Sequence, residues 1–377
     1  MTTLADLETP SLVLDRTRLE RNLAAMRERC RGLGVSLRTH VKTPKSVEIG
    51  RRAHGGQAGP IAVSTLREAE HFAQNGFRDI LCAVAIAPAK LRRVAAIQKA
   101  TRSTVRVVLD SEVVARAIAD FAGAEAGGCI EALIEIDCGE HRSGIAPDDP
   151  ALLAIARHLD APGVQLAGVM THGGHSYASA DAARVREVAA IERDSATTAA
   201  RRLREAGHAA PIVSVGSSPT ILHAEHLDGV TEARCGVYTL WDLAQASRGM
   251  CRLDDIAASV LATVIGHNRA GQSLILDAGA LALSKDISAN TFMPEAGYGL
   301  VCDAVTCTPL APLAVSVVHQ EHGSVRVPDE TWYARLPIGT QVRILPNHTC
   351  MTCAAYESYH VLENDRVVDT WGRVNGW

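Results

Sequence analysis

A lysine in a short polar run is the first residue of this sequence whose position could do chemistry. Lys42 ends an apolar-flanked segment in the run Leu37-Arg38-Thr39-His40-Val41-Lys42-Thr43-Pro44-Lys45. A lysine amine can form a Schiff base with a carbonyl cofactor when burial or a neighbouring cation lowers its pKa. His40 and Lys45 are the neighbours expected to supply such a charge. The simpler alternative is a surface lysine pair that closes a strand.

Two later runs are suited to binding a phosphate group. They are Ser214-Val215-Gly216-Ser217-Ser218-Pro219-Thr220 and Arg234-Cys235-Gly236-Val237-Tyr238. Small residues let the backbone approach a ligand closely and donate several N–H groups, and the serine hydroxyls add further donors. A cofactor with both a phosphate and an aldehyde could join these runs to Lys42. Pyridoxal phosphate has both groups.

An imidazole and a thiol stand two residues apart near the C-terminal end. The run is Pro346-Asn347-His348-Thr349-Cys350-Met351-Thr352-Cys353. In an extended segment, positions i and i+2 face the same way, so His348 and Cys350 could bind one cation. A nitrogen and a sulfur ligand favour zinc, and water and substrate would fill the other positions. The alternative is a buried histidine beside an ordinary core cysteine.

Three further polar runs are candidates of the same kind. Each has a simpler explanation: a solvated loop for the first, a core histidine for the second and a turn for the third. The runs are Glu135-Ile136-Asp137-Cys138-Gly139-Glu140-His141-Arg142-Ser143-Gly144, then Met170-Thr171-His172-Gly173-Gly174-His175-Ser176-Tyr177, and Gln320-Glu321-His322-Gly323.

The elements that position these residues alternate regularly between strand and helix patterns. Helical periodicity is found in segments such as 66–75, 90–99, 112–121 and 180–206. Eight strand candidates with crossovers between them predict a closed (β/α)8 barrel over residues 16–250, with reactive groups after the strands. The absence of G-x-G-x-x-G after the first strand weighs against a dinucleotide-binding domain. The eight strand candidates are residues 37–42, 60–64, 79–84, 104–109, 130–137, 165–171, 211–216 and 231–238.

The pattern of apolar and turn residues changes near residue 250. From Ala257 onward short apolar runs alternate with turn residues, which is typical of antiparallel strands. We therefore predict a second, all-β domain over residues 251–377, which residues 1–15 join as a strand. The runs are 260–265, 273–277, 313–318, 339–344 and 366–371.

The composition and charge of the chain exclude several classes of protein. The chain has 377 residues, 47% of them hydrophobic, and a formal net charge of -4, so neither nucleic acid nor an anionic membrane is an expected partner. No apolar run reaches the roughly 18 residues that span a bilayer. No signal-peptide pattern opens the chain, and the ten cysteines show no framework spacing. These features predict a cytoplasmic protein with reduced thiols.

Taken together, the motifs resemble those of the fold-type III pyridoxal-phosphate enzymes, which have the alanine racemase layout. Within them the chain is most similar to the metal-dependent group of D-serine dehydratase, D-threo-3-hydroxyaspartate dehydratase and D-threonine aldolase. The resemblance covers essentially the whole chain, and its most specific parts are His40-Val41-Lys42-Thr43 and Pro346-Asn347-His348-Thr349-Cys350. One departure is Pro44, where many relatives have a histidine, which affects what assists Lys42.

This resemblance implies roles for individual residues. Lys42 would hold pyridoxal phosphate, Arg142 would meet its phenolic oxygen and His172 would pack against its ring. Arg234 would lie near the pyridine nitrogen, with Tyr177 as the competing candidate. His348 and Cys350 would bind a divalent metal, zinc or else manganese. The phosphate would be held by Gly216, Ser217, Ser218, Gly236 and Val237.

The resemblance also implies a reaction, catalysed by a homodimer. Lys42 would remove the Cα proton of a D-3-hydroxy amino acid, and the metal would act as a Lewis acid on its hydroxyl group. Loss of the hydroxyl gives a 2-oxo acid and ammonia, whereas deprotonation of the hydroxyl gives glycine and an aldehyde. The similar aldolases have His-x-Asp where this chain has His348-x-Cys350, so a dehydratase is favoured, with D-threo-3-hydroxyaspartate preferred over D-serine as its substrate.

Two other functions remain open from the sequence. An amino-acid racemase would need a second acid, for which Tyr298 in Ala296-Gly297-Tyr298-Gly299 is a candidate. It would leave His348 and Cys350 without a role. A cofactor-carrier protein with a lone barrel would lack the residues beyond 250.

Overall fold

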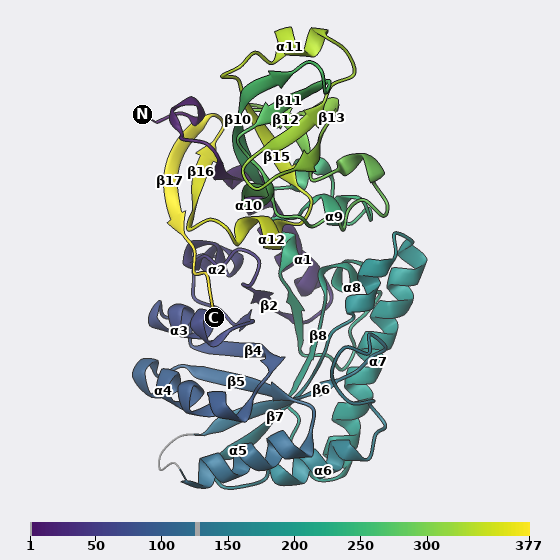
Figure 1. The fold of residues 1–377 in the computed structure, drawn as a ribbon. Coiled ribbons are helices and arrows are strands. Elements are labelled where there is room, and N and C mark those ends of the chain that lie inside the picture. Colours follow the sequence, from purple (N-terminus) through teal and green to yellow (C-terminus); the bar gives the residue numbers. More distant parts are fainter. Residues whose placement is uncertain (1, 125–128) are drawn as a thin grey trace. The chain divides into compact units, whose positions relative to one another are not determined.

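A computed structural model describes residues 2–124 and 129–377 of the chain (Figure 1). It divides into two compact units. The barrel unit contains Ala25–Gly236 together with residues 376 and 377, and the β unit contains the residues up to Ala24 and Val237–Asn375.

The barrel unit is built on eight parallel strands that close on themselves. Closure is made by the pairing of the first and last strands, which runs from Ser36 opposite Glu232 to Thr39 opposite Cys235. Each apolar segment predicted from the sequence overlaps one of these strands, and the predicted α/β barrel is confirmed. The strands are β2 (Ser36–His40), β3 (Ile61–Val63), β4 (Asp79–Ala85), β5 (Thr104–Leu109), β6 (Ile130–Ile136), β7 (Val164–Thr171), β8 (Ile212–Val215) and β9 (Glu232–Cys235).

Amphipathic helices follow the strands of the barrel. In α3, Leu66, Ala69 and Phe72 recur at helical spacing and are buried, and the Thr65 side chain caps the helix by accepting the N–H of Glu68. The four predicted helical segments coincide with α3, α4, α5 and α7. The helices are α1 (Arg16–Gly32), α2 (Val47–Ala53), α3 (Leu66–Gln74), α4 (Leu91–Thr101), α5 (Glu112–Ala124), α6 (Ala151–His158), α7 (Ala182–Glu205) and α8 (Ser218–His223).

The two ends of the barrel interior differ in chemistry. Near the N-terminal ends of the strands, buried Arg38 pairs with Glu232 at 2.8 Å and with Asp79 at 2.7 Å, and Arg106 pairs with Asp79 and with Glu131. These ion pairs tie together strands β2, β4, β5, β6 and β9. An end filled in this way serves stability, whereas the C-terminal ends of barrel strands carry functional groups.

The β unit contains a nine-stranded, mainly antiparallel sheet among the described residues. Strand β1 pairs antiparallel with β10 and parallel with β16. The sequence did not predict the strands β12, β14 and β16, which are defined by their pairing with neighbouring strands. The strands are β1 (Ser11–Asp15), β10 (Ala258–Asn268), β11 (Ser273–Leu276), β12 (Gly299–Asp303), β13 (Pro309–Val318), β14 (Gly323–Arg326), β15 (Gln341–Pro346), β16 (Ser358–Glu363) and β17 (Arg366–Gly372).

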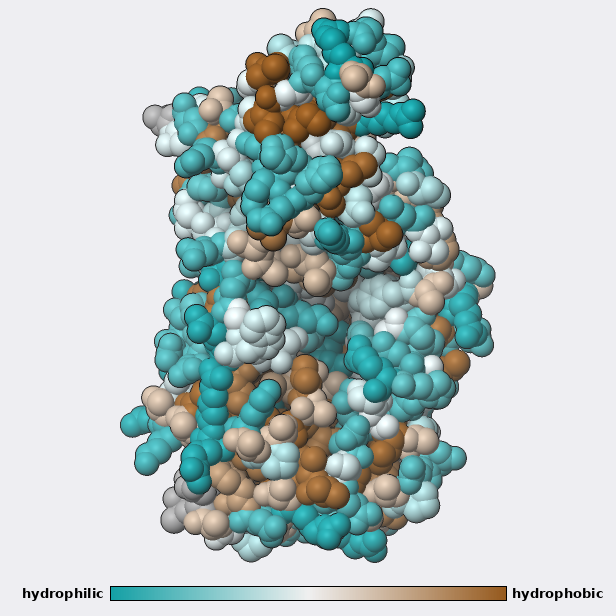
Figure 2. All heavy atoms as spheres, viewed as in Figure 1, coloured by the Kyte–Doolittle hydropathy of each residue, from teal (hydrophilic) through white to brown (hydrophobic). Residues whose placement is uncertain are grey.

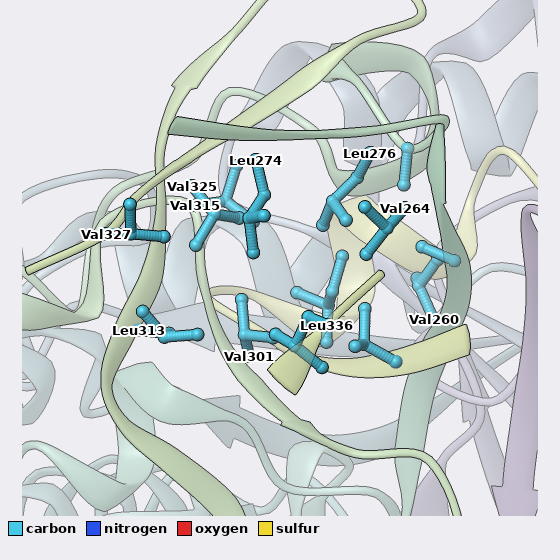
Figure 3. Close-up of a cluster of buried hydrophobic side chains, with 14 of the residues drawn as sticks. Val260, Val264, Leu274, Leu276, Val301, Leu313, Val315, Val325, Val327 and Leu336 are labelled. Carbon is cyan, nitrogen blue, oxygen red and sulfur yellow. The ribbon is translucent and has the colours of Figure 1, made fainter. Parts of the chain in front are cut away.

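Branched aliphatic side chains from this sheet form the core of the β unit. Figure 3 shows side chains of several strands, among them Val264, Leu276, Val301 and Val315, pointing toward one another. The unit also contains the short helices α9 (Leu243–Ala246), α10 (Ala280–Leu283), α11 (Thr331–Arg335) and α12 (Thr349–Cys353). Of these, α12 carries one of the predicted metal ligands.

Hydrophilic residues cover much of the face seen in Figure 2, and smaller hydrophobic areas interrupt them. None of the helices in the part of the chain that the structure describes is both long and apolar enough to span a bilayer.

The β-unit core predicts a matched pair of stability effects. Val315 is fully buried, whereas Val317 on the same strand is 48% exposed. Replacing Val315 by alanine removes two buried methyl groups and leaves a cavity, so we expect a loss of about 2 kcal/mol in the free energy of unfolding of the β unit. Val317→Ala should change it by less than about 0.5 kcal/mol.

Urea unfolding followed by tryptophan fluorescence measures this difference, because three of the four tryptophans, Trp241, Trp332 and Trp371, are buried in the β unit. The fourth, Trp377, is already exposed in the folded protein. Equal losses in the two variants would contradict the assignment of Val315 to the core.

Candidate active site

Lys42 lies two residues beyond the end of β2, with an exposed side chain. The two neighbours predicted to add positive charge beside it do not do so. Burial lowers the pKa of His40 well below its usual value, and the charges of Lys42 and Arg234 lower it further, so His40 is neutral at pH 7. Lys45 pairs with the buried Glu68 at 3.0 Å, which balances its charge. The prediction that His40 and Lys45 supply charge to Lys42 is therefore wrong.

His172, directly after β7, is held as a neutral ring. Its Nδ1 lies 2.6 Å from the carbonyl oxygen of Gly216, so this nitrogen carries the proton and donates it. Burial lowers the pKa of His172 to about 3, against the effect of this hydrogen bond, and the charges of Arg234, Lys42 and Arg142 act in the same direction as burial. These electrostatic effects place four predicted site residues in one neighbourhood of the barrel unit.

The predicted cofactor-binding residues Arg234, Tyr177 and Arg142 differ in their burial and in the contacts that hold their side chains. Arg234 is buried, and its guanidinium donates to the Ser214 hydroxyl at 2.8 Å and to the Thr171 carbonyl at 2.7 Å. The ring of Tyr177 lies 6.5 Å from that of His172, centroid to centroid. Arg142 is exposed and lies 3.4 Å from a carboxylate oxygen of Glu140.

Two glycines in the loops after β8 and β9 lie very close to the backbone of neighbouring strands. Gly216 has a φ of +143°, and a Cβ atom there would lie 2.2 Å from the carbonyl oxygen of Arg234. A Cβ atom on Gly236 would lie 2.6 Å from the carbonyl oxygen of His40. Val237 follows directly in the chain. Only glycine fits at positions 216 and 236, because backbone atoms of a neighbouring strand occupy the space that a Cβ atom would need.

The hydrogen bonds of the first loop change the prediction for individual donors. The Gly216 N–H donates to Glu192 at 3.0 Å, and the Ser217 N–H donates to the Thr220 hydroxyl at 3.0 Å. These two N–H groups therefore already have partners. Among the described residues, the buried Ser218 hydroxyl oxygen has no hydrogen-bond partner. Because an unpaired buried hydroxyl is costly, Ser218 is the donor in this loop with most to gain from a phosphate.

Glu192 is a residue of this site that the sequence analysis missed. It lies on α7 with 1% of its surface exposed, and one carboxylate oxygen accepts both the Gly173 N–H at 2.5 Å and the Gly216 N–H at 3.0 Å. Burial raises its pKa. Glu192 thus joins the loop after β7 to the loop after β8. The available signal was an acidic residue on the apolar, helically spaced face of residues 182–205.

The predicted metal pair in the β unit begins at a buried asparagine. Asn347, directly after β15, accepts the Ala289 N–H at 2.8 Å and donates to Asn290 and to the Gly297 carbonyl, both at 2.8 Å. His348 follows with extended dihedral angles. The backbone before the two predicted ligands is therefore fixed by side-chain hydrogen bonds.

The conformation of Cys350 differs from the prediction. Helix α12 begins at Thr349, whose N–H donates to the buried Asp242 at 3.1 Å and whose hydroxyl donates to the Trp241 carbonyl. Cys350 consequently lies in the first turn of a helix, and the prediction of an extended segment through 350 is wrong. Asp242 provides a helix-capping acceptor from a distant part of the chain, which a local pattern does not reveal.

The side chains of His348 and Cys350 nevertheless meet. Burial lowers the pKa of His348, but hydrogen bonds with Asp286 and Cys350 raise it to about 11 overall. Asp286 lies 2.7 Å from Nδ1 of His348. A carboxylate on one ring nitrogen orients the other toward a metal. Asp286, which the sequence analysis also missed, lies in a loop without a recognisable pattern.

The part of the chain that the structure describes contains no group of three or more histidine, cysteine, aspartate or glutamate side chains arranged to hold a metal. A cation at His348 and Cys350 would thus have two protein ligands, as the sequence predicted, and would take water or substrate at the others.

Two other predicted candidates have structural roles in the β unit. The Gln320–Gly323 run forms the turn between β13 and β14, and the side chains of Glu321 and His322 are exposed. The Tyr298 N–H donates to the Val315 carbonyl at 2.8 Å, and the Tyr298 side chain packs against the core.

The sequence matches the alanine racemase N-terminal domain family over residues 14–242 and a putative serine dehydratase domain over residues 257–362. It is 44% identical to the D-threo-3-hydroxyaspartate dehydratase of Delftia sp. strain HT23, covering 100% of this chain and 99% of that protein. It is 30% identical to the D-serine dehydratase of Dictyostelium discoideum, covering 96% and 95% of the two chains. It is also 30% identical to the D-threonine aldolase of an Arthrobacter species, covering 98% and 92%.

Comparison of the folds leads to the same group of enzymes as comparison of the sequences. The solved structure of the Delftia dehydratase matches with a TM-score of 0.96 and 43% identity over 100% of both chains. The resemblance deduced from the motifs is confirmed: the chain belongs to the alanine racemase N-terminal domain family, within its group of D-threo-3-hydroxyaspartate dehydratases, D-serine dehydratases and D-threonine aldolases, and it is a lyase.

Proposed function

We propose that the chain is a pyridoxal-phosphate- and divalent-metal-dependent dehydratase of D-3-hydroxy amino acids. D-threo-3-hydroxyaspartate is the favoured substrate and D-serine the second, and the products are a 2-oxo acid and ammonia. The observation that carries this proposal is the 44% identity, over the whole chain, to an enzyme of that name. The pairing of His348 with Cys350 supports it independently.

The barrel unit has the residues that pyridoxal phosphate requires. Lys42 offers an exposed amine, and the Ser218 hydroxyl lacks a partner among the described residues. Gly216 and Gly236 pack so closely against the carbonyls of Arg234 and His40 that no side chain fits there, which fixes the two proposed phosphate loops. Ser217 and Val237 complete the proposed phosphate loops. When bound, the cofactor would take up the negative charge that develops at the substrate Cα.

The residues around Lys42 have distinct tasks in this proposal. The Lys42 amine takes the Cα proton of the substrate, acting as the general base. His172 is neutral and donates its Nδ1 proton to Gly216, so it serves as a flat surface for a ring rather than as an acid. Arg234 is fixed by two hydrogen bonds and would meet the pyridine nitrogen, for which Tyr177 is the alternative. Arg142 would meet the phenolic oxygen.

His348 and Cys350 would hold the metal in the β unit. A nitrogen and a sulfur ligand favour zinc over manganese, which prefers oxygen. Hydroxide is a poor leaving group, and a divalent cation bound to it acts as a Lewis acid that lowers the cost of its departure. Asp286 would orient His348, and the two remaining positions suit water and substrate.

An aldolase is the alternative function. The chain is 30% identical to a D-threonine aldolase, and both reactions begin with a D-3-hydroxy amino acid and a lysine base. Cys350 is the residue that favours the dehydratase, because the similar aldolases have an aspartate there. A racemase is less well supported, since Tyr298 packs on the β-unit core and the metal pair would have no role.

A homodimer and a location in the cytoplasm stay predictions. Sedimentation of the purified protein and fractionation of the source cells measure them.

The proposed reaction predicts a product. Protein supplied with pyridoxal phosphate and zinc should release ammonia and oxaloacetate from D-threo-3-hydroxyaspartate, and ammonia and pyruvate more slowly from D-serine. A chelator should abolish turnover while the yellow cofactor stays bound. Lys42→Ala should lower turnover by more than about 10²-fold, because it removes the general base.

Glycine and an aldehyde as main products would instead establish the aldolase. Arg366→Ala, an exposed cation in β17, is a control that should keep full activity.

The bridge made by Glu192 predicts an effect on cofactor affinity. Glu192→Leu leaves two buried N–H groups without an acceptor, at a cost of about 1–3 kcal/mol for each, so pyridoxal phosphate should bind about tenfold or more weakly. Glu192→Gln keeps an acceptor oxygen and should bind the cofactor nearly as well as the parent protein. Titration followed by cofactor absorbance measures both affinities.

The control for this pair is Glu187→Leu on the exposed face of the same helix, which should leave the affinity unchanged. If Glu192→Gln weakened binding as much as Glu192→Leu, the acceptor role of Glu192 would be excluded.

The contact between Asp286 and His348 predicts an effect on metal affinity. Asp286→Asn removes the carboxylate that orients the ring, so zinc affinity should fall about 10- to 100-fold. Competition with a chromophoric chelator measures the dissociation constant without any assay of turnover. Asp365→Asn, which replaces an exposed carboxylate between β16 and β17, should leave zinc binding unchanged, and a similar loss in both variants would refute the role of Asp286.

A further inference from the structure

We propose that Cys350 and Cys353 form a reversible disulfide in the metal-free protein, so that a hydroperoxide and the metal compete for Cys350. The inference rests on the proposed metal site and adds a site of oxidative modification to it. It concerns the second thiol of the Cys350-Met351-Thr352-Cys353 run, which the proposed reaction does not use.

The two cysteines lie in one turn of helix. Helix α12 runs from Thr349 to Cys353, so both thiols belong to it and are three residues apart. Residues at i and i+3 of a helix face the same side, with Cβ atoms about 5–6 Å apart. A disulfide needs Cβ atoms about 4 Å apart. A slight tightening of this single short turn is enough to join the two sulfur atoms.

The charges of the described side chains indicate that the thiols are close. Burial raises the pKa of Cys353 to about 11, and its electrostatic interaction with Cys350 acts in the same direction. Arg373 interacts with Tyr359, Cys353 and Cys350, and its Nε donates to the Tyr359 hydroxyl at 3.0 Å. One half-buried guanidinium therefore lies close enough to both sulfur atoms to interact with each.

The different exposure of Cys350 and Cys353 indicates which thiol reacts with the oxidant first. Cys350 is partly exposed and hydrogen-bonded to His348, so a small oxidant can reach its thiol. Cys353, three residues further along the same helix, is fully buried. Cys350 would be the attacking thiol and Cys353 the resolving thiol. All ten cysteines, each of which the structure describes, are thiols in it.

The chemistry balances with hydrogen peroxide as the oxidant. The Cys350 sulfur attacks one peroxide oxygen, the O–O bond breaks, and a sulfenic acid and water form. The Cys353 sulfur then attacks the Cys350 sulfur, and the S–O bond of the sulfenic acid breaks. The hydroxyl group leaves with the proton of the Cys353 thiol as a second water. The two thiols lose two electrons in total and the peroxide gains them. A dithiol such as dithiothreitol reverses the change by exchange.

This pair would make metal binding and oxidation mutually exclusive. A disulfide removes one of the two proposed protein ligands, and a bound metal occupies the Cys350 sulfur that must attack the peroxide. Oxidised protein should therefore fail to bind zinc until it is reduced, and zinc-loaded protein should resist peroxide.

The experiment treats the full-length protein with hydrogen peroxide, once after chelation and once with excess zinc. Blocking of free thiols followed by peptide mass spectrometry then locates any disulfide. We expect a link between Cys350 and Cys353, with a mass loss of two hydrogens, in the metal-free sample. Zinc at about a hundred times its dissociation constant should slow its formation about 100-fold, because only the metal-free fraction reacts.

Two variants sharpen the result. In Cys353→Ser the resolving thiol is absent, so Cys350 should accumulate as sulfenic and sulfinic acid. Cys129→Ser replaces an exposed cysteine of the barrel unit and should form the disulfide like the parent protein.

The absence of the Cys350–Cys353 link in oxidised, metal-free protein would overturn the redox pair, and metal-dependent turnover would still stand by itself. Formation of the disulfide at the same rate with and without zinc would overturn the competition, and with it the assignment of Cys350 as a metal ligand.

Discussion

The pairing of β2 with β9 is the constraint on which the site in the barrel unit depends. Residues 36–39 and 232–235 are far apart in the sequence, yet they pair in register and close the barrel. Closure brings Gly236 so near the carbonyl of His40 that no side chain fits there. Because all strands run in parallel, their C-terminal ends share one rim. Lys42, His172 and Gly216 follow strands that end at it, and Arg234 lies within β9.

Buried polar groups then fix the loops at this rim. Glu192 and His172 make hydrogen bonds to the backbone of the loops after β7 and β8, and Arg234 donates to the ends of β7 and β8. In a low-dielectric interior such bonds are strong and the loss of a partner is expensive, so a connected set of them holds loops in one conformation. The Ser218 hydroxyl is one of the buried polar groups of the described residues that lack such a partner. The ion pairs of Arg38 and Arg106 at the other end of the barrel stabilise the fold, so it can tolerate the cost of the unpaired Ser218 hydroxyl.

In the β unit the candidate metal ligands are positioned differently, because they lie at the start of the short helix α12, just after strand β15. Asp286 hydrogen-bonds to the His348 ring and Asp242 accepts the N–H of Thr349, both from distant parts of the chain. The Asn347 side chain accepts the N–H of Ala289 and so fixes the segment from its other end. The same helix turn that presents Cys350 also carries Cys353 at its other end. Metal chemistry and thiol chemistry would therefore depend on one small element, which links the proposed metal affinity to the oxidation state of the protein.

The sequence by itself determined the elements and the reactive residue types. Period-two and period-3.6 patterns are local, so the eight barrel strands, the main helices and the β texture after residue 250 could be predicted. The strands β12, β14 and β16 could not, because pairing rather than composition defines them. The motifs around Lys42 and His348 likewise identified the family, since they are contiguous.

Only the tertiary structure decided which other groups complete the sites and what charge they carry. Glu192 and Asp286 reach their partners across 24 and 62 residues of sequence. His40 is neutral because it is buried, and Cys350 is helical because Asp242 caps its helix. Burial, long-range hydrogen bonds and charge compensation depend on the folded arrangement, so no local pattern of residues could have revealed them.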